Sequence, residues 1–201
     1  MIIKNASFIT SAASRTQFLH PNKPMIAVCG KSNVGKSSLI NKLAGRNKLA
    51  KTSAEPGRTR LVNYFDFGEF MLADLPGYGY AKVSKVEKEK WAKLLDEFFS
   101  RKEELAHVFL LVDLRHEPGE NDVQMTEYLH YHTIPYSVIA TKADKLSKMQ
   151  QKAAVRTVAA GLKLGEANVI PFSSETGAGK DEVLSKIEGI LNLLKEPSEE
   201  A

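Results

Sequence analysis

The 201-residue chain has 28 basic and 24 acidic side chains, 43% hydrophobic residues and a formal net charge of +4. This balance is typical of a globular domain and excludes a disordered or collagen-like chain. No apolar run reaches the roughly 20 residues of a membrane span, and no signal peptide opens the sequence. Cys29 is the single cysteine, so an internal disulfide is excluded. We therefore expect a cytoplasmic protein that makes no membrane contact.

The positive charge is concentrated in one part of the chain. Residues 31–60 have eight basic side chains and one acidic side chain, a net charge of +7, whereas the rest of the chain sums to −3. A polyphosphate ligand accounts for only one or two of these cations. The surplus indicates a second polyanion such as nucleic acid, with a solvated basic surface as the alternative.

The hydrophobic pattern predicts alternating strands and helices. Residues 1–24 are weakly patterned and form an N-terminal extension that either adds a short strand or packs on the core. Residues 46–60 read as a long functional loop, and 196–201 as an acidic tail. We expect strands over 25–29, 61–67, 70–73, 107–112, 136–140 and 169–172, and helices over 37–45, 84–99, 122–132, 147–162 and 180–194.

These elements predict one α/β domain over residues 25–195. The sheet is expected to have six strands and to be mostly parallel, with helices on both faces. The strands over 61–67 and 70–73 form a hairpin and so introduce one antiparallel strand. In such open sheets, ligands bind at the carboxyl ends of the strands, and each motif described below follows a strand.

The first motif, G-x-x-x-x-G-K-S, lies between the strand 25–29 and the next helix. This is the phosphate-binding loop (P-loop), in which Gly30 and Gly35 let the backbone wrap around a polyphosphate. Successive backbone N–H groups and the start of the helix attract the anion. Lys36 adds a charge on the β- and γ-phosphates, and the Ser37 hydroxyl is a ligand for Mg²⁺.

Two further motifs suit a triphosphate and its metal. Asp74-Leu75-Pro76-Gly77 follows a strand, where an aspartate can hold Mg²⁺ through a water and Gly77 can offer its N–H to the γ-phosphate. A plain turn is the alternative for this motif. Thr59, in the basic loop, can ligate Mg²⁺ when the γ-phosphate holds the loop closed.

The last two motifs suit a guanine base. They are Thr141-Lys142-Ala143-Asp144 and Phe172-Ser173-Ser174. The Asp144 carboxylate can accept hydrogen bonds from the guanine N1–H and exocyclic amine but repels the adenine N1 acceptor, so it discriminates between the bases. Lys142 can lay its stem over the base. Backbone N–H groups near Ser174 can bind the guanine O6.

The five motifs together resemble the translation-factor-related P-loop GTPases from about residue 25 to 194. Tyr78-Gly-Tyr80 and Leu114-Arg-His116 make the closer resemblance one to the EngB (YihA/YsxC) family of bacterial ribosome-assembly GTPases. The resemblance implies a single GTPase domain that binds GTP and GDP, requires Mg²⁺, matures the large ribosomal subunit and is needed for cell division and septation. We expect a monomer.

The resemblance also implies a set of functional residues. Mg²⁺ is ligated by Ser37 and Thr59, with Asp74 acting through a water. The residues implied in catalysis are Lys36, Asn33, Thr59 and Gly77. The residues implied in GTP binding are Gly30, Lys31, Ser32, Asn33, Val34, Gly35, Lys36, Ser37, Ser38, Gly57, Arg58, Thr59, Arg60, Leu61, Asp74, Leu75, Pro76, Gly77, Thr141, Lys142, Ala143, Asp144, Phe172, Ser173 and Ser174.

One departure from Ras-like enzymes concerns the rate of hydrolysis. Those enzymes place a water-orienting glutamine directly after D-x-x-G, where this chain has Tyr78, so we expect slow intrinsic hydrolysis. In related GTPases an asparagine at the position of Asn33 helps to bind a potassium ion, which can neutralise developing charge. His116 suits a general base less well than a structural or partner-contact role.

Two other classes of function compete with the GTP-controlled switch. A division-linked scaffold would use GTP mainly as a structural ligand, and a broad exposed apolar patch would favour it. A small-molecule kinase would also carry a P-loop. The guanine-selective Asp144 argues against the kinase.

Overall fold

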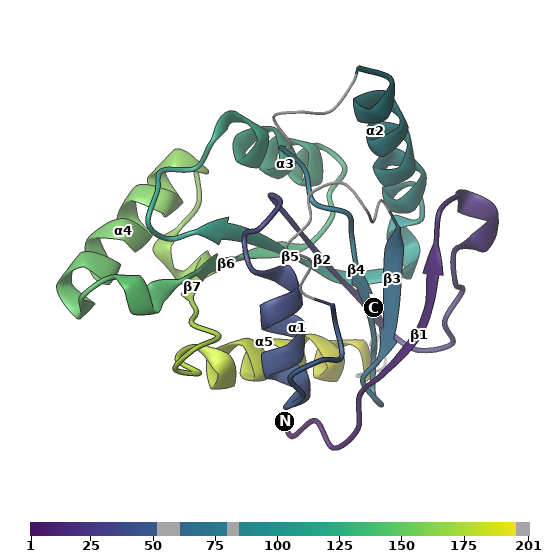
Figure 1. Cartoon of the computed structure of the whole chain (residues 1–201), viewed down its shortest axis with the longest axis horizontal. Helices are drawn as coiled ribbons and strands as arrows, with labels where there is room; N and C mark the ends of the chain where they lie inside the picture. Colours follow the sequence, from purple (N-terminus) through teal and green to yellow (C-terminus); the bar gives the residue numbers. More distant parts are fainter. Residues whose placement is uncertain (52–60, 80–84, 196–201) are drawn as a thin grey trace, which may run out of the picture.

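The computed structural model describes residues 1–51, 61–79 and 85–195, and these form an α/β domain around one sheet (Figure 1). The strands are β1 (Ser7–Ala12), β2 (Met25–Gly30), β3 (Val62–Asp66), β4 (Met71–Asp74), β5 (Leu105–Asp113), β6 (Tyr136–Thr141) and β7 (Val169–Pro171). The α-helices are α1 (Lys36–Ala44), α2 (Lys85–Phe99), α3 (Glu120–Tyr131), α4 (Lys148–Gly161) and α5 (Lys180–Lys195). Short 3₁₀ helices are η1 (Arg15–Gln17), η2 (Lys102–Glu104), η3 (Ala143–Lys145) and η4 (Glu166–Asn168).

The sheet has seven strands in the order β1-β3-β4-β2-β5-β6-β7, so the expected fold class is confirmed and the expected number of six strands is wrong. The additional strand is β1, from the N-terminal extension, which pairs antiparallel with β3 at the edge of the sheet. The predicted hairpin is confirmed, because β3 also pairs antiparallel with β4. The remaining neighbours are parallel.

Helices cover both faces of the sheet because the central strands are apolar on both sides. In β2, Met25, Ala27 and Cys29 belong to one buried cluster, together with side chains of α2, α3 and α4. Ile26 and Val28 belong to the other, with side chains of α1 and α5. This period of two is that of a strand buried on both faces.

The helix starts follow from local signals where the structure describes them. The Ser147 hydroxyl accepts a hydrogen bond from the Gln150 N–H, and Gln150 Oε1 accepts one from the Ser147 N–H, which is the capping box that opens α4. The expected capping box of α2 begins at Ser84, which lies outside the described residues. Within the described ranges, every helix is too short or too polar to cross a bilayer.

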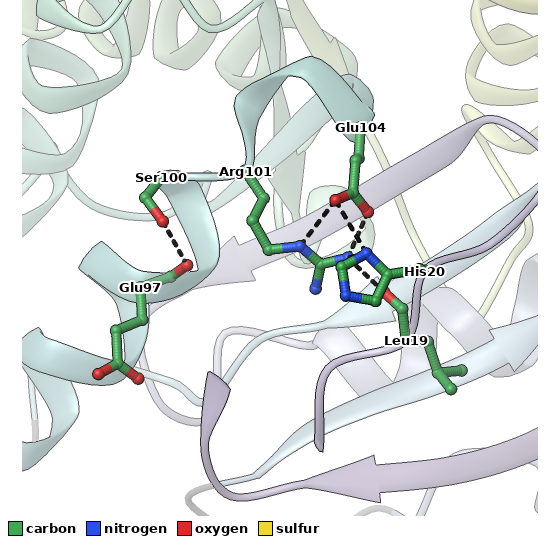
Figure 2. A network of polar contacts seen from close by, with 6 residues as sticks. All are labelled: Leu19, His20, Glu97, Ser100, Arg101 and Glu104. Atoms are coloured by element: carbon green, nitrogen blue, oxygen red, sulfur yellow. Dashed lines mark hydrogen bonds and ion pairs between the residues drawn. The ribbon is translucent and has the colours of Figure 1, made fainter. Parts of the chain in front are cut away.

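Arg101, at the end of α2, attaches the N-terminal extension to the domain (Figure 2). Its guanidinium donates to the Leu19 carbonyl at 2.6 Å, pairs with Glu104, and lies 5.7 Å from the centre of the Phe18 ring. The His20 ring contacts both Arg101 and Glu104. The extension therefore packs against α2 as well as adding β1 to the sheet.

Candidate functional site

The phosphate-binding loop joins β2 to α1 in a conformation that requires glycine at both ends. Gly30 has φ +152°, and a Cβ there would lie 2.7 Å from the Leu111 carbonyl oxygen of the neighbouring strand. Gly35 has φ +113° and is the N-cap of α1. Between them, Asn33 is exposed with φ +60°. Positive φ values at Gly30, Asn33 and Gly35 give the loop the tight turn that backbone anion-binding sites use.

The loop after β4 lies directly against the phosphate-binding loop. The Ser32 N–H donates to the Tyr78 carbonyl at 2.9 Å, and the Tyr78 N–H donates to the Gly30 carbonyl at 3.3 Å. A Cβ on Gly77 would lie 3.0 Å from Ser32 Cα and 3.2 Å from Lys36 Nζ. Glycine leaves room for this close approach, which brings the Gly77 backbone next to the Lys36 ammonium group.

Asp74, at the carboxyl end of β4, is a buried carboxylate with an unsatisfied oxygen. It is 7% exposed, and its Oδ1 has no hydrogen-bond partner among the described residues. Burial raises the pKa of Asp74 to about 6, against the opposing effects of Lys36 and Asn63. A buried oxygen without a hydrogen-bond partner costs free energy. It suits a bound water or hydrated cation, as expected for Mg²⁺.

Thr141 places the start of the predicted base motif next to the phosphate-binding loop. The Thr141 hydroxyl lies 2.6 Å from the Val34 carbonyl oxygen, inside the phosphate-binding loop. Lys142 has φ +63°, and its ammonium group lies 2.9 Å from Asp113, at the end of β5. Burial favours a higher pKa for Asp113, but hydrogen bonds from Arg115 and Lys142 outweigh it and hold that pKa well below its usual range.

Asp144 is held in place by the loop after β7. The Ser173 hydroxyl donates to Asp144 Oδ1 at 2.7 Å, and this bond lowers the pKa of the carboxyl group. Lys145 lies 3.0 Å from Asp144 Oδ2. The Ala143 N–H also donates to the Phe172 carbonyl at 3.1 Å. The two predicted base motifs are therefore brought together, with a charged and oriented carboxylate between them.

Tyr78 points away from the phosphate loop rather than into it. Its ring is 4% exposed, and its hydroxyl donates to Asp122 Oδ1, on α3, at 2.7 Å. Burial, Cys29 and Asp122 raise the pKa of this hydroxyl. The Tyr78 side chain is therefore buried and hydrogen-bonded within the protein interior. This agrees with the expectation that it does not orient an attacking water.

Some predicted residues stand apart from this site. Gly57, Arg58, Thr59 and Arg60 lie outside the described residues, and the described chain resumes at the half-buried Leu61. His116 is exposed, and its N–H donates to the Asp113 carbonyl at 3.2 Å. The hydrogen bond from Ser173 to Asp144 has no signature in the sequence. A serine before a helix has many ordinary roles.

Comparisons with known proteins agree with this geometry. Residues 25–142 match the family described as 50S ribosome-binding GTPase. The probable GTP-binding protein EngB of Pelotomaculum thermopropionicum is 48% identical over 93% of this chain and 96% of its own length. That of Oceanobacillus iheyensis is 42% identical over 93% and 97%.

A solved structure shares the fold. The crystal structure of a probable GTP-binding protein EngB superposes with a TM-score of 0.69 at 21% identity, covering 84% of this chain and 98% of the other. The sequence matches to the two EngB relatives extend over 93% of this chain. The chain therefore belongs to the EngB family of P-loop GTPases.

Proposed function

We propose that this protein is a GTP-controlled switch that binds the large ribosomal subunit or its precursor in the GTP state and leaves after hydrolysis. On this proposal, assembly of the subunit and normal cell division and septation depend on it, and it acts as a cytoplasmic monomer. The observation that carries the proposal is the attachment of an exposed basic segment to the helix that begins at the phosphate site.

That attachment is made by Asn41 of α1. Its side-chain amide donates to the Ala50 carbonyl at 2.9 Å and its carbonyl accepts from the Ala50 N–H at 2.8 Å. Asn41 is 8% exposed, whereas Arg46, Lys48 and Lys51 are exposed. The segment before residue 52 is thus held against α1 with its cations outward. Charges presented in this way suit the phosphates of RNA.

The nucleotide site supports GTP as the ligand that controls the switch. Asp144 is the group that would select guanine, and Ser37, Thr59 and Asp74 would hold Mg²⁺. When bound, that ion neutralises charge on the β- and γ-phosphates. Lys36 would contact the same phosphates, and the Gly77 N–H would contact the γ-phosphate. A potassium ion beside Asn33 would neutralise negative charge that develops during hydrolysis. It would thereby compensate in part for the water-orienting glutamine that Tyr78 replaces.

The direct test is sedimentation of the protein with large ribosomal subunits, with GTP, with GDP and without nucleotide. We expect most binding with GTP and a steep loss of binding as salt rises, because phosphate contacts release counterions. Lys48→Ala combined with Lys51→Ala should weaken binding, whereas Lys152→Ala, on α4, should not.

The same experiment addresses the scaffold alternative. A scaffold that uses GTP as a structural ligand would bind its partner equally with either nucleotide. Binding that ignores nucleotide state, salt and both lysines would overturn the switch.

A further inference from the structure

A pocket of about 180 Å³ lies between α2 and α3, next to the loop that carries Gly77. It is lined by Tyr78, Trp91, Ala92, Leu95, Asp96, Phe99, Asn121, Gln124, Met125 and Tyr128. The floor is apolar and buried, since Tyr78, Leu95, Phe99 and Met125 are each at most 7% exposed. Asp96, Asn121 and Gln124 are exposed and give the pocket a polar rim. None of the nucleotide-binding roles above uses this pocket.

We propose that this pocket is a docking site for a partner protein, which inserts a phenylalanine side chain and pairs a neighbouring basic residue with Asp96. An apolar cavity of roughly 150 Å³ is large enough for benzene, so this pocket can take a phenyl ring. Its floor offers two aromatic rings and the Met125 sulfur, all of which favour an aromatic guest.

The polar rim of the pocket indicates which kind of partner residue would lie beside the inserted phenylalanine. Asp96 is an exposed carboxylate whose Oδ1 accepts a hydrogen bond from the Tyr128 hydroxyl at 3.1 Å. That bond holds the carboxylate at the edge of the pocket. Asn121 and Gln124 are uncharged, so a basic residue beside the inserted ring finds one acidic partner at the rim. Buried aromatic anchors with a polar rim are the usual form of a protein-binding hot spot.

Both walls of the pocket are hydrogen-bonded to the loop that includes Gly77. From α2, the Trp91 indole N–H donates to the Pro76 carbonyl at 3.1 Å. On the other side, the Tyr78 hydroxyl donates to Asp122 of α3 at 2.7 Å. A guest that moves α2 relative to α3 therefore acts on the residues on either side of Gly77. Coupling to the nucleotide, which rests on the proposed function, is then reciprocal: the nucleotide changes the affinity of the pocket.

The protein has its own reporter for this test, because Trp91 is its single tryptophan. We would titrate the nucleotide-free protein with the dipeptide N-acetyl-Phe-Arg-amide and follow tryptophan fluorescence and the indole N–H resonance. Saturable binding is expected. N-acetyl-Ala-Arg-amide should bind at least roughly tenfold more weakly because it loses the buried ring. N-acetyl-Phe-citrulline-amide should lose roughly threefold, the size expected of an exposed ion pair.

Matched variants test whether the Phe-Arg peptide binds in the pocket between α2 and α3. Asp96→Asn should weaken Phe-Arg binding to the level of the citrulline peptide, and Glu97→Gln, which removes the same charge next to it, should not. Ala92→Phe should fill the pocket and abolish binding, whereas Lys93→Phe adds the same ring to α2 outside the pocket and should leave binding intact. Circular dichroism of each variant verifies that it is folded.

Four results would contradict the pocket, its partner, its coupling to the nucleotide or the proposed function. No saturable response, or equal binding of the Phe and Ala peptides, would overturn the pocket as an aromatic site. Binding of benzyl alcohol as tight as that of Phe-Arg would overturn the protein partner in favour of a free small molecule. Equal peptide affinity with GDP and with a non-hydrolysable GTP analogue would overturn the coupling. Failure to bind any guanine nucleotide would overturn the proposed function and leave the nucleotide-free titration valid.

Discussion

At the scale of single residues, Asp144 is the group to which the proposed site assigns base selection. We expect Asp144→Asn to lower GTP affinity by roughly a hundredfold or more and to favour xanthine nucleotides, because the amide no longer accepts both guanine donors. Lys145→Ala, which removes only an exposed ion-pair partner of Asp144, should change affinity little. Competition titrations with GTP, ATP and xanthosine triphosphate measure this. Equal competition by ATP in the unmodified protein would refute the assignment.

Asn33 provides a second test at this scale. It is exposed within the phosphate-binding loop, so its side chain is free to contribute to a cation site beside the phosphates. Turnover of GTP should be faster in potassium than in sodium at equal ionic strength, and Asn33→Ala should remove the difference. The same rate in both salts for the unmodified protein would exclude Asn33 from the mechanism.

At the scale of elements, the bond from Tyr78 to Asp122 connects the loop after β4 to α3. Tyr78→Phe leaves a buried carboxylate oxygen without its partner, so the free energy of unfolding should fall by roughly 1–3 kcal/mol. Tyr128→Phe removes a similar bond to the exposed Asp96 and should cost less. Urea unfolding measures both. Turnover of GTP by folded Tyr78→Phe should stay close to normal, and a large loss would mean that the hydroxyl takes part in hydrolysis.

Asn41 connects α1 to the basic segment in a comparable way. Asn41→Ala leaves both the Ala50 N–H and its carbonyl without partners, so we expect a loss of roughly 2 kcal/mol in the free energy of unfolding. Affinity for ribosomal subunits should also fall, because the released cations must be ordered on binding. Asn47→Ala, in the same segment and exposed, is the control. Unchanged affinity in Asn41→Ala would separate the basic segment from RNA binding.

The sequence predicts the elements around the site better than the contacts between them. The phosphate loop and the base motifs follow from local spacing, because glycine, lysine and aspartate have few alternatives at those positions. The sequence does not predict β1 clearly, since its apolar residues do not alternate and its pairing with β3 depends on residues 50 to 59 positions away. The contacts of Tyr78 and Asn41 were missed for the same reason: each depends on a tertiary partner, and a tyrosine or asparagine alone does not identify one.

At the scale of the whole molecule, two buried groups, His107 and Asp74, make stability depend on pH in opposite directions. Burial lowers the pKa of His107, in β5, to about 4. The unfolded chain therefore binds more protons than the native state between roughly pH 6.5 and 4, so His107 lowers stability as pH falls through that range. Asp74 has the opposite effect and raises stability as pH falls. Its raised pKa of about 6 makes the native state bind more protons than the unfolded chain between roughly pH 4 and 6.

Comparing the stability of the unmodified protein with that of His107→Gln isolates the effect of the histidine, since Asp74 is present in both proteins. Without nucleotide, the unmodified protein should lose roughly 3 kcal/mol relative to His107→Gln between pH 7 and pH 4. The glutamine can still bond to Ser137, whose hydroxyl lies 3.0 Å from His107 Nε2. His116→Gln, at an exposed position, should not alter the profile. Parallel stability curves for the unmodified protein and His107→Gln would contradict the assignment.

The order of strands in the sheet also limits what a growing chain can do during translation. The strand that leads into the phosphate loop, β2, lies between β4 and β5, so it has both neighbours only after Asp113 has left the ribosome. The serine that orients Asp144 is residue 173, and α5 covers the sheet later still. A nascent chain therefore cannot orient Asp144 through this hydrogen bond before residue 173 has been made. In the proposed site, the phosphate loop is thus made early and selection of guanine becomes possible only later, once Ser173 has been added.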